Sequence, residues 1–110
     1  MHKVKIKALS VNECWQGRRF KTPSYLAYER ALSVLLPKCV EVPEGPLALF
    51  LEVGQSNMAA DFDNPVKPFC DILSKKYGFN DKQITEAVVR KRKVEKGGEY
   101  ILFNIVSADS

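Results

Sequence analysis

The sequence lacks any apolar run close to the roughly 18 residues that a membrane-spanning helix needs. Its N-terminus also lacks the apolar stretch of a secretory signal peptide. We therefore expect a protein of the cytoplasm that has no membrane partner.

The sequence is also poor in the residues that build disulfide frameworks and zinc sites. Its three cysteines, Cys14, Cys39 and Cys70, are odd in number and far apart, and no two of them have the C-x-x-C spacing. This pattern argues against both kinds of cross-link, so we expect reduced and partly buried thiols. The single histidine, His2, has no partner pattern for metal binding or acid–base chemistry.

What the chain does contain suits one compact domain. Its 110 residues are 45% hydrophobic and 27% charged, which is enough for a core but leaves no room for a second domain. No internal repeat is visible, so residues 1–110 should share one fold. The formal charge of +4 and the pI near 9.0 favour a polyanionic partner, although so modest an excess identifies none.

Hydrophobic periodicity predicts the elements of the first half of the chain. Val4, Ile6 and Ala8 alternate with lysines, as in a strand over residues 3–8 with one buried face. Residues 12–21 have no clean period and carry three positive charges, so we expect a loop or arm.

A first helix is predicted to begin at Thr22-Pro23, where a capping hydroxyl precedes a proline in the first helical position. It should end before Pro37, and its buried stripe should consist of Tyr25, Tyr28, Leu32, Leu35 and Leu36. Residues 47–53 are short and apolar, which predicts a buried strand. Residues 54–64 are polar and irregular.

A second helix is predicted to begin at Asn64-Pro65, because asparagine is a good cap and proline suits the first turn. Its buried stripe should be Phe69, Ile72 and Leu73, with the stem of Lys76. Residues 84–93 and 100–106 are predicted to be two strands joined around Gly97-Gly98 as an antiparallel hairpin.

These elements follow the order strand, helix, strand, helix, strand, strand. Such an order predicts an α/β (α+β) fold with a small mixed sheet of about four strands. The two helices would pack mainly on one face of the sheet and leave the other face open to a partner.

The residues that could carry chemistry surround the start of the second helix. Asp61 and Asp63 are two residues apart in chain expected to be extended, so their carboxylates point the same way and could hold one hard cation. Because helical side chains lean toward the N-terminus, Lys67 can bring its ammonium group beside them. At this end of a helix the dipole disfavours a cation by roughly 0.3–1 kcal/mol, unless nearby anions or a bound phosphate offset it.

Each of these residues also has a simpler interpretation. Asp61 and Asp63 could serve only turn formation and capping, and Lys67 could form a surface ion pair with Asp71, four residues further on. Asp71 could also be a more distant acid of the same site. Asp81 taken alone would be a turn residue, and whether the fold returns it to the other acids is a question of topology.

Two motifs carry a resemblance to a known family. The stretches D-F-D-N-P-V-K at 61–67 and Y-G-F-N-D-K-Q-I at 77–84 resemble the RusA family of Holliday junction resolvases, which occurs mostly on phages and prophages. The basic W-Q-G-R-R-F-K-T at 15–22, followed by Tyr25 and Tyr28, is also similar to members of that family. The resemblance covers roughly residues 3–106.

The resemblance implies a homodimeric α/β endonuclease that binds branched DNA and nicks two opposed strands of a four-way junction. It implies Asp61, Asp63 and Asp81 as ligands of Mg²⁺, or of Mn²⁺ in its place, with Lys67 as the fourth catalytic residue. The setting it implies is the cytoplasm of a bacterial host, with a phage or prophage as the source of the gene.

This chain departs from the family pattern at two places. Asn80 precedes Asp81 where the family often has two acids, and Met58-Ala59-Ala60 stands where the family often has arginines. The missing arginines, together with the pI, leave an alternative open. In that alternative the chain is a non-catalytic nucleic-acid-binding module that uses its basic arm and its sheet face.

Two groups of cations are candidates for contact with DNA. Arg18, Arg19 and Lys21 in the arm could contact backbone phosphates, while Trp15 and Phe20 could stack on unpaired bases or pack in the core.

The second group lies in the strand predicted over residues 84–93. The run from Arg90 to Lys93 places two charges on each face of that strand, so one pair, Arg90 and Arg92, could face DNA at once. Protection of a sheet edge explains such charges equally well.

Overall fold

The computed structural model describes residues 1–10, 15–16, 20–58 and 64–108. Its main elements are strand β1 (His2–Val4), helix α1 (Pro23–Leu35), strand β4 (Leu47–Gln55), helix α2 (Val66–Tyr77), strand β5 (Ile84–Lys93) and strand β6 (Tyr100–Ser107). Shorter elements are strand β2 (Trp15–Gln16), strand β3 (Phe20–Lys21) and the 3-10 turn η2 (Asp81–Gln83). The predicted order of main elements and the α+β class are confirmed. None of the helices within the described ranges is long and apolar enough to cross a membrane.

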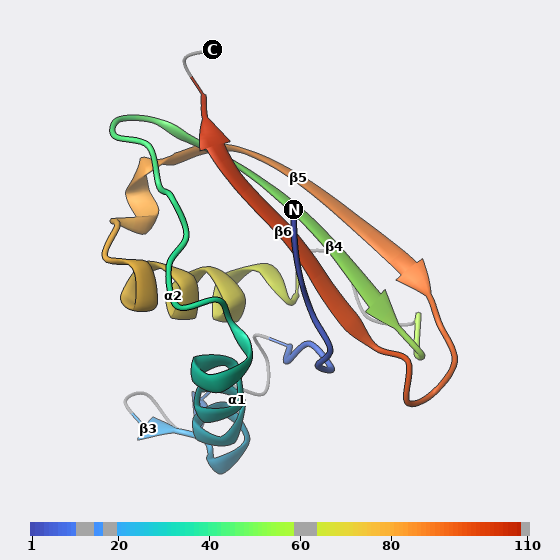
Figure 1. Cartoon of the computed structure of the whole chain (residues 1–110). Coiled ribbons are helices and arrows are strands. Elements are labelled where there is room, and N and C mark those ends of the chain that lie inside the picture. The colour runs from blue at the N-terminus through green and yellow to red at the C-terminus, as the bar shows by residue number, and fades with distance from the viewer. Residues whose placement is uncertain (11–14, 17–19, 59–63, 109–110) are drawn as a thin grey trace.

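Four strands form one mixed sheet in the order β1, β6, β4, β5, and both helices lie on the same side of it (Figure 1). The core lies between this face of the sheet and the helices. The ring of Phe69 on α2 meets the ring of Phe103 on β6 edge-on, with 5.4 Å between the ring centroids. The opposite face of the sheet carries no helix of the described chain, as predicted (Figure 1).

Strand β4 is the centre of the sheet. Its alternate residues Leu47, Leu49, Leu51 and Val53 are at most 2% exposed, and they point toward the helices. β4 pairs in parallel with β5 and antiparallel with β6 over nearly its whole length. β4 therefore joins β5 to the rest of the sheet, while β1 is joined to it through β6.

The predicted hairpin of β5 and β6 is wrong. The two strands run in opposite directions, but β4 lies between them, so residues 94–99 cross the end of β4. Two strand spacings amount to only about 10 Å, which an extended segment of this length spans easily. The apolar sequence of β4 suits the middle position, where none of its residues is exposed, whereas most residues of β5 are exposed, as suits an edge strand.

The first strand is shorter than predicted. Its pairing with β6 ends at Val4 and Ile101, close to Tyr100, where β6 begins. The predicted alternation nevertheless continues, since Ile6 and Ala8 pack against the core while the lysines between them are exposed. The alternation thus predicted which side chains face the core, but it did not predict where the strand ends.

The segment expected to be a loop or arm contains two short paired strands. β2 and β3 run antiparallel, with Trp15 opposite Lys21. Strands of two residues are too short to produce a hydrophobic period, so the sequence carries no signal for them. Arg18 and Arg19 lie outside the described residues.

The first helix begins as predicted. The Thr22 hydroxyl oxygen accepts a hydrogen bond from the backbone N–H of Tyr25 at 3.1 Å, and Pro23 occupies the first helical position. The predicted stripe is buried with one exception, because Leu35 is 46% exposed and points to solvent.

The second helix begins differently from the prediction. Pro65, in helical backbone conformation, occupies the cap position, and Asn64 stands one residue outside the helix. No side chain caps α2, and the carbonyl of Pro65 accepts the first helical hydrogen bond, from Phe69 at 3.4 Å. At the other end Gly78 adopts the left-handed conformation that suits glycine, with φ of 73°, and turns the chain back toward the sheet.

Gly54 in β4 is required by packing. On the open face of the sheet the ring of Tyr100 lies over it, and a Cβ atom at Gly54 would be 2.4 Å and 2.5 Å from two ring carbons. The ring is held in place because its hydroxyl donates a hydrogen bond to Glu52 Oε2 at 2.7 Å and Lys3 Nζ lies 4.6 Å from its centroid.

We expect Gly54→Ala to destabilise the protein by about 1–3 kcal/mol, the usual cost of forcing an extra methyl group into packed structure. In a Tyr100→Ala background the same change should cost much less, because the ring that it strikes is gone. Urea unfolding of the four proteins of this double-mutant cycle measures the coupling. Equal costs in the two backgrounds would show that the ring is not the obstacle.

Candidate active site

Lys67 in the first turn of α2 lies between two carboxylates. Its Nζ atom bonds Asp71 Oδ1 at 2.9 Å and Asp81 Oδ2 at 3.3 Å. Asp71 lies one turn further along the same helix, as the predicted surface ion pair requires. Asp81 is 14 residues away in sequence, so the fold itself brings it to Lys67.

The position of Asp81 is fixed by the turn that contains it. Asn80 caps η2, since its side chain accepts from the N–H of Lys82 at 2.9 Å while Gln83 Oε1 accepts from the N–H of Asn80 at 3.0 Å. Gln83 Nε2 also donates to the carbonyl of Gly45 at 3.0 Å, which ties the turn to the chain before β4. Asn80 and Gln83 are thus structural residues, a role that was not predicted from the sequence for either.

The charge of Lys67 is stabilised by its neighbours. The hydrogen bonds to Asp71 and then to Asp81 raise the pKa of Lys67 above its ordinary value of 10.5. At neutral pH the side chain is therefore a fixed positive charge and not a base. The two carboxylates also offset the unfavourable position of Lys67 near the helix N-terminus.

The ion-paired side chains are accessible to a ligand. Lys67 has 62% of its side chain exposed and Asp81 has 39%, at a hollow that Val66, Cys70 and Ile84 also line. Burial raises the pKa of the Cys70 thiol to about 11, so the free thiol is protonated at neutral pH and is a poor nucleophile. Cys39 is exposed, and both cysteines are free thiols.

The predicted acids Asp61 and Asp63 lie outside the described residues. Within the described ranges, no three acid, cysteine or histidine side chains come together as a metal site. Of the four predicted catalytic residues, the structure thus describes Lys67 and Asp81 and brings these two into contact.

Two lysines of β5 bind the backbone just before residues 59–63, which we call the acid segment because it contains Asp61 and Asp63. Lys91 Nζ donates to the carbonyl of Met58 at 2.9 Å, and Lys93 Nζ donates to the carbonyl of Ser56. Their side chains lie on the helix-covered side, because Lys91 is opposite the buried Val53. The alternation from Arg90 to Lys93 indicated that Lys91 and Lys93 share one face of the strand. It did not indicate that this pair would bind the chain that leaves β4.

The cations predicted to contact DNA are spread over the molecule. Lys21 lies over the ring of Tyr25, with 4.8 Å from Nζ to the centroid. The guanidinium carbon of Arg90 lies 5.6 Å from the centroid of the Phe50 ring.

Arg92 Nε donates to Glu52 Oε1 at 3.3 Å. The pKa of Glu52 is lowered mainly by the hydrogen bond from the Tyr100 hydroxyl, and also by the hydrogen bond from Arg92. The register places Arg90 and Arg92 opposite Glu52 and Gly54, on the open face of the sheet. This is the face turned away from α2 and Lys67.

The comparisons with known proteins add no relative. No known protein family matches the sequence, and no curated protein is significantly similar to it. The family suggested by the two motifs therefore remains a prediction from those motifs.

Proposed function

We propose that this protein is a divalent-metal-dependent endonuclease that cuts branched DNA, with Asp61, Asp63, Lys67 and Asp81 as its active site. The observation that carries the proposal is the contact between Lys67 Nζ and Asp81 Oδ2, at 3.3 Å. The motif resemblance requires these two residues to share a site. Their separation along the chain gives no local reason for them to meet.

The residues present fit a hard cation such as Mg²⁺ or Mn²⁺. Carboxylate oxygens are the ligands that these ions prefer, and Asp81 presents its carboxylate at a solvent-accessible hollow. Asp61 and Asp63 would complete the ligand set from the segment that enters α2. When bound, the cation would neutralise charge on the phosphate and lower the pKa of a bound water.

Lys67 would act on the phosphate as a fixed charge. Its ammonium group is protonated at neutral pH and keeps three donors, so it can bind a nonbridging phosphate oxygen while Asp71 holds it from the side. Charge that develops on the phosphate in the transition state would then be stabilised by a group already in place. Asp71 would be a positioning residue that acts through Lys67.

The four-way junction and the dimer complete the proposal. Two copies of the chain would present two such sites, and each would nick one of two opposed strands. Symmetric paired nicks on a synthetic junction, mapped on all four strands, would distinguish this activity from that of a flap or single-strand nuclease.

We expect Asp81→Asn to slow junction cleavage in Mg²⁺ on the order of 10²–10³-fold, because a ligand of the cation is lost. Asp63→Asn should have a similar effect. Binding to the junction in EDTA should persist in both variants, because these carboxylates repel phosphate when no cation is bound. Single-turnover cleavage and fluorescence anisotropy measure the two properties.

Asp71→Asn is the matched control for Asp81→Asn. Both acids bond Lys67 Nζ, and Asp71 is the nearer at 2.9 Å against 3.3 Å. If the acids only pair with Lys67, Asp71→Asn should slow cleavage at least as much as Asp81→Asn. We expect a much smaller effect. If the wild type binds the junction tightly but does not cut it with any divalent metal ion, the chain is instead a non-catalytic binding module.

A further prediction concerns the charge of Lys67. Lys67→Met should slow cleavage on the order of 10²-fold, whereas melting should change little because exposed ion pairs stabilise by about 0–1 kcal/mol. Since the pKa of Lys67 is raised, its ion pairs contribute to stability below about pH 10.5 and are lost as pH rises through the folded-state pKa.

Wild-type cleavage should therefore show no loss due to Lys67 between about pH 7 and 9. The pH–rate profiles of the wild type and of Lys67→Arg, which keeps the charge, should run parallel in that range. A basic-limb pKa in the wild type that is absent from Lys67→Arg would show that Lys67 titrates during the reaction.

A further inference from the structure

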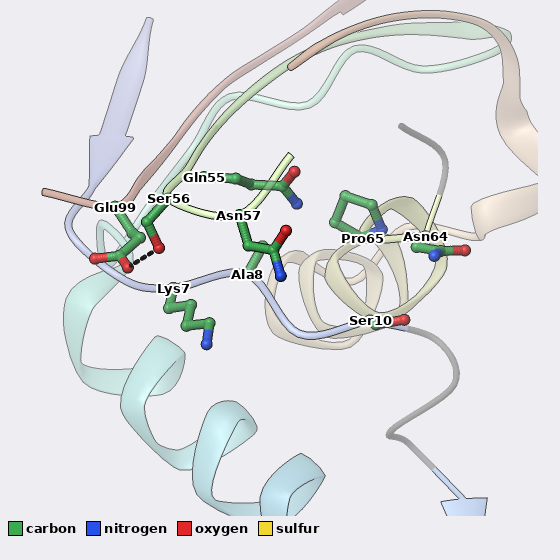
Figure 2. A pocket seen from close by; sticks show the side chains of 9 residues that line it. All are labelled: Lys7, Ala8, Ser10, Gln55, Ser56, Asn57, Asn64, Pro65 and Glu99. Atoms are coloured by element: carbon green, nitrogen blue, oxygen red, sulfur yellow. Dashed lines mark hydrogen bonds between the residues drawn. The ribbon is translucent and has the colours of Figure 1, made fainter. Parts of the chain in front are cut away.

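A separate cavity of about 180 Å³ lies between the end of β4 and the start of α2 (Figure 2). Three carboxamide side chains line it, those of Gln55, Asn57 and Asn64, together with the hydroxyl groups of Ser10 and Ser56. Figure 2 shows Gln55 at the end of β4, Asn57 just beyond it, Asn64 beside Pro65, and Ser10 on the N-terminal segment. Neither Lys67 nor Asp81 lines this cavity.

The cavity adjoins the acid segment on both sides. Asn57 is two residues before residue 59, and Asn64 directly follows Asp63, so residues 59–63 connect two of its walls. Ser56 is held by Lys93, and the next residue but one, Met58, is held by Lys91. Pro65, which also lines the cavity, is two residues before Lys67, so the cavity borders the start of the helix that carries this proposed catalytic residue.

The amide oxygen of Gln55 is buried without a hydrogen-bond partner among the described residues. Its Oε1 atom is inaccessible to solvent and makes no hydrogen bond with the described residues. An unsatisfied buried acceptor is costly, so the Gln55 amide has hydrogen-bonding capacity to offer a ligand beside it. No side chain caps α2, and the side chain of Asn64 lines the cavity.

The charges in the lining balance each other. Lys7 and Glu99 are the charged residues of the wall, and Glu99 accepts from the Ser56 hydroxyl at 2.9 Å and from the N–H of Gly97 at 2.8 Å (Figure 2). A site for a phosphate would carry an excess of cations. A lining of carboxamides with no excess charge suits a neutral planar group that presents both donors and acceptors.

Nucleobases have this chemistry. Asparagine and glutamine pair with base edges through one donor and one acceptor. The volume is below the roughly 300–1,000 Å³ of pockets for drug-sized ligands, so it suits a fragment such as one base. Bases near a branch point can leave the stack at a cost of a few kcal/mol, least where they are already unpaired.

We propose that this cavity receives one unpaired nucleobase of the DNA substrate and positions the neighbouring phosphate for cleavage. The proposal rests on the proposed nuclease function and adds to it a site of base recognition. Gln55 and Asn64 are its principal contacts, and they read the edge of the base through their carboxamides.

The first experiment titrates the full-length protein with each of the four nucleosides and follows the side-chain amide signals of Gln55 and Asn64 by NMR. We expect saturable shifts of both amides with at least one nucleoside. N-acetyl amino-acid amides serve as the comparison, because a peptide could also use carboxamides. Shifts with these amides alone, or with no compound, would overturn the proposal without bearing on cleavage.

The second experiment measures binding to a four-way junction in EDTA, with one abasic site placed in turn at each position beside the branch. At one position the loss of the base should weaken wild-type binding about tenfold, within the range for base contacts. Gln55→Leu, which keeps the volume but removes the amide, should bind both junctions equally. Asn104→Leu, on the open face, should keep the wild-type sensitivity, and Asn64→Ala replaces Gln55→Leu if that variant does not fold.

Cleavage in Mg²⁺ separates the two proposals. If the wild type cuts junctions but an abasic site does not weaken its binding through Gln55 or Asn64, the base site is refuted. The nuclease assignment then stays in place. A wild type that neither binds nor cuts junctions refutes the nuclease assignment, and the base site on DNA with it.

Discussion

The parallel pairing of β4 with β5 is the constraint on which the candidate site depends. Parallel neighbours cannot be joined by a tight turn, so the chain must leave the end of β4, cross the sheet and return to the end where β4 begins. Here the crossover contains the acid segment, α2 and η2, in that order. The proposed site residues all lie in this crossover, so the parallel pairing of β4 and β5 determines where the crossover must begin and end.

This crossover explains why Asp81 meets Lys67. β5 starts beside Leu47, and η2 is tied to Gly45, so Asp81 lies at the end of the sheet where β4 begins. α2 passes under the sheet between the two ends, and Lys67 in its first turn reaches Asp81 with a long side chain. The first turn of α2 and the turn after the helix are thus joined by the side chain of Lys67.

Local patterns predicted the elements well because each has a local cause. The Thr22 cap, the buried alternation of β4 and the stripe of α2 are all set by residues within a few positions of one another. The pairing of β5 with β4 has no local cause of this kind. Gly97-Gly98 favours a tight turn, but a turn does not fix which strands pair, and the most apolar strand takes the centre of the sheet wherever it stands in the sequence.

The candidate site divides in the same way. The contact between Lys67 and Asp71 follows from helical spacing, whereas that between Lys67 and Asp81 needs the crossover and was predicted only through the motif resemblance. The roles of Lys91 and Lys93 could not be predicted, because they depend on the parallel register that places β5 beside the chain leaving β4. The three carboxamides of the cavity likewise come to line one site only in the folded chain.

The double ion pair of Lys67 has a consequence for the proposed reaction. While Asp71 and Asp81 both hold the ammonium group, much of its charge is compensated and its attraction for a phosphate is reduced. A cation that occupied the Asp81 carboxylate would compete with Lys67 for it. The freed donor of Lys67 would then be available to the phosphate that the same cation attracts, so loading of the metal and engagement of Lys67 with the substrate would be coupled through one carboxylate.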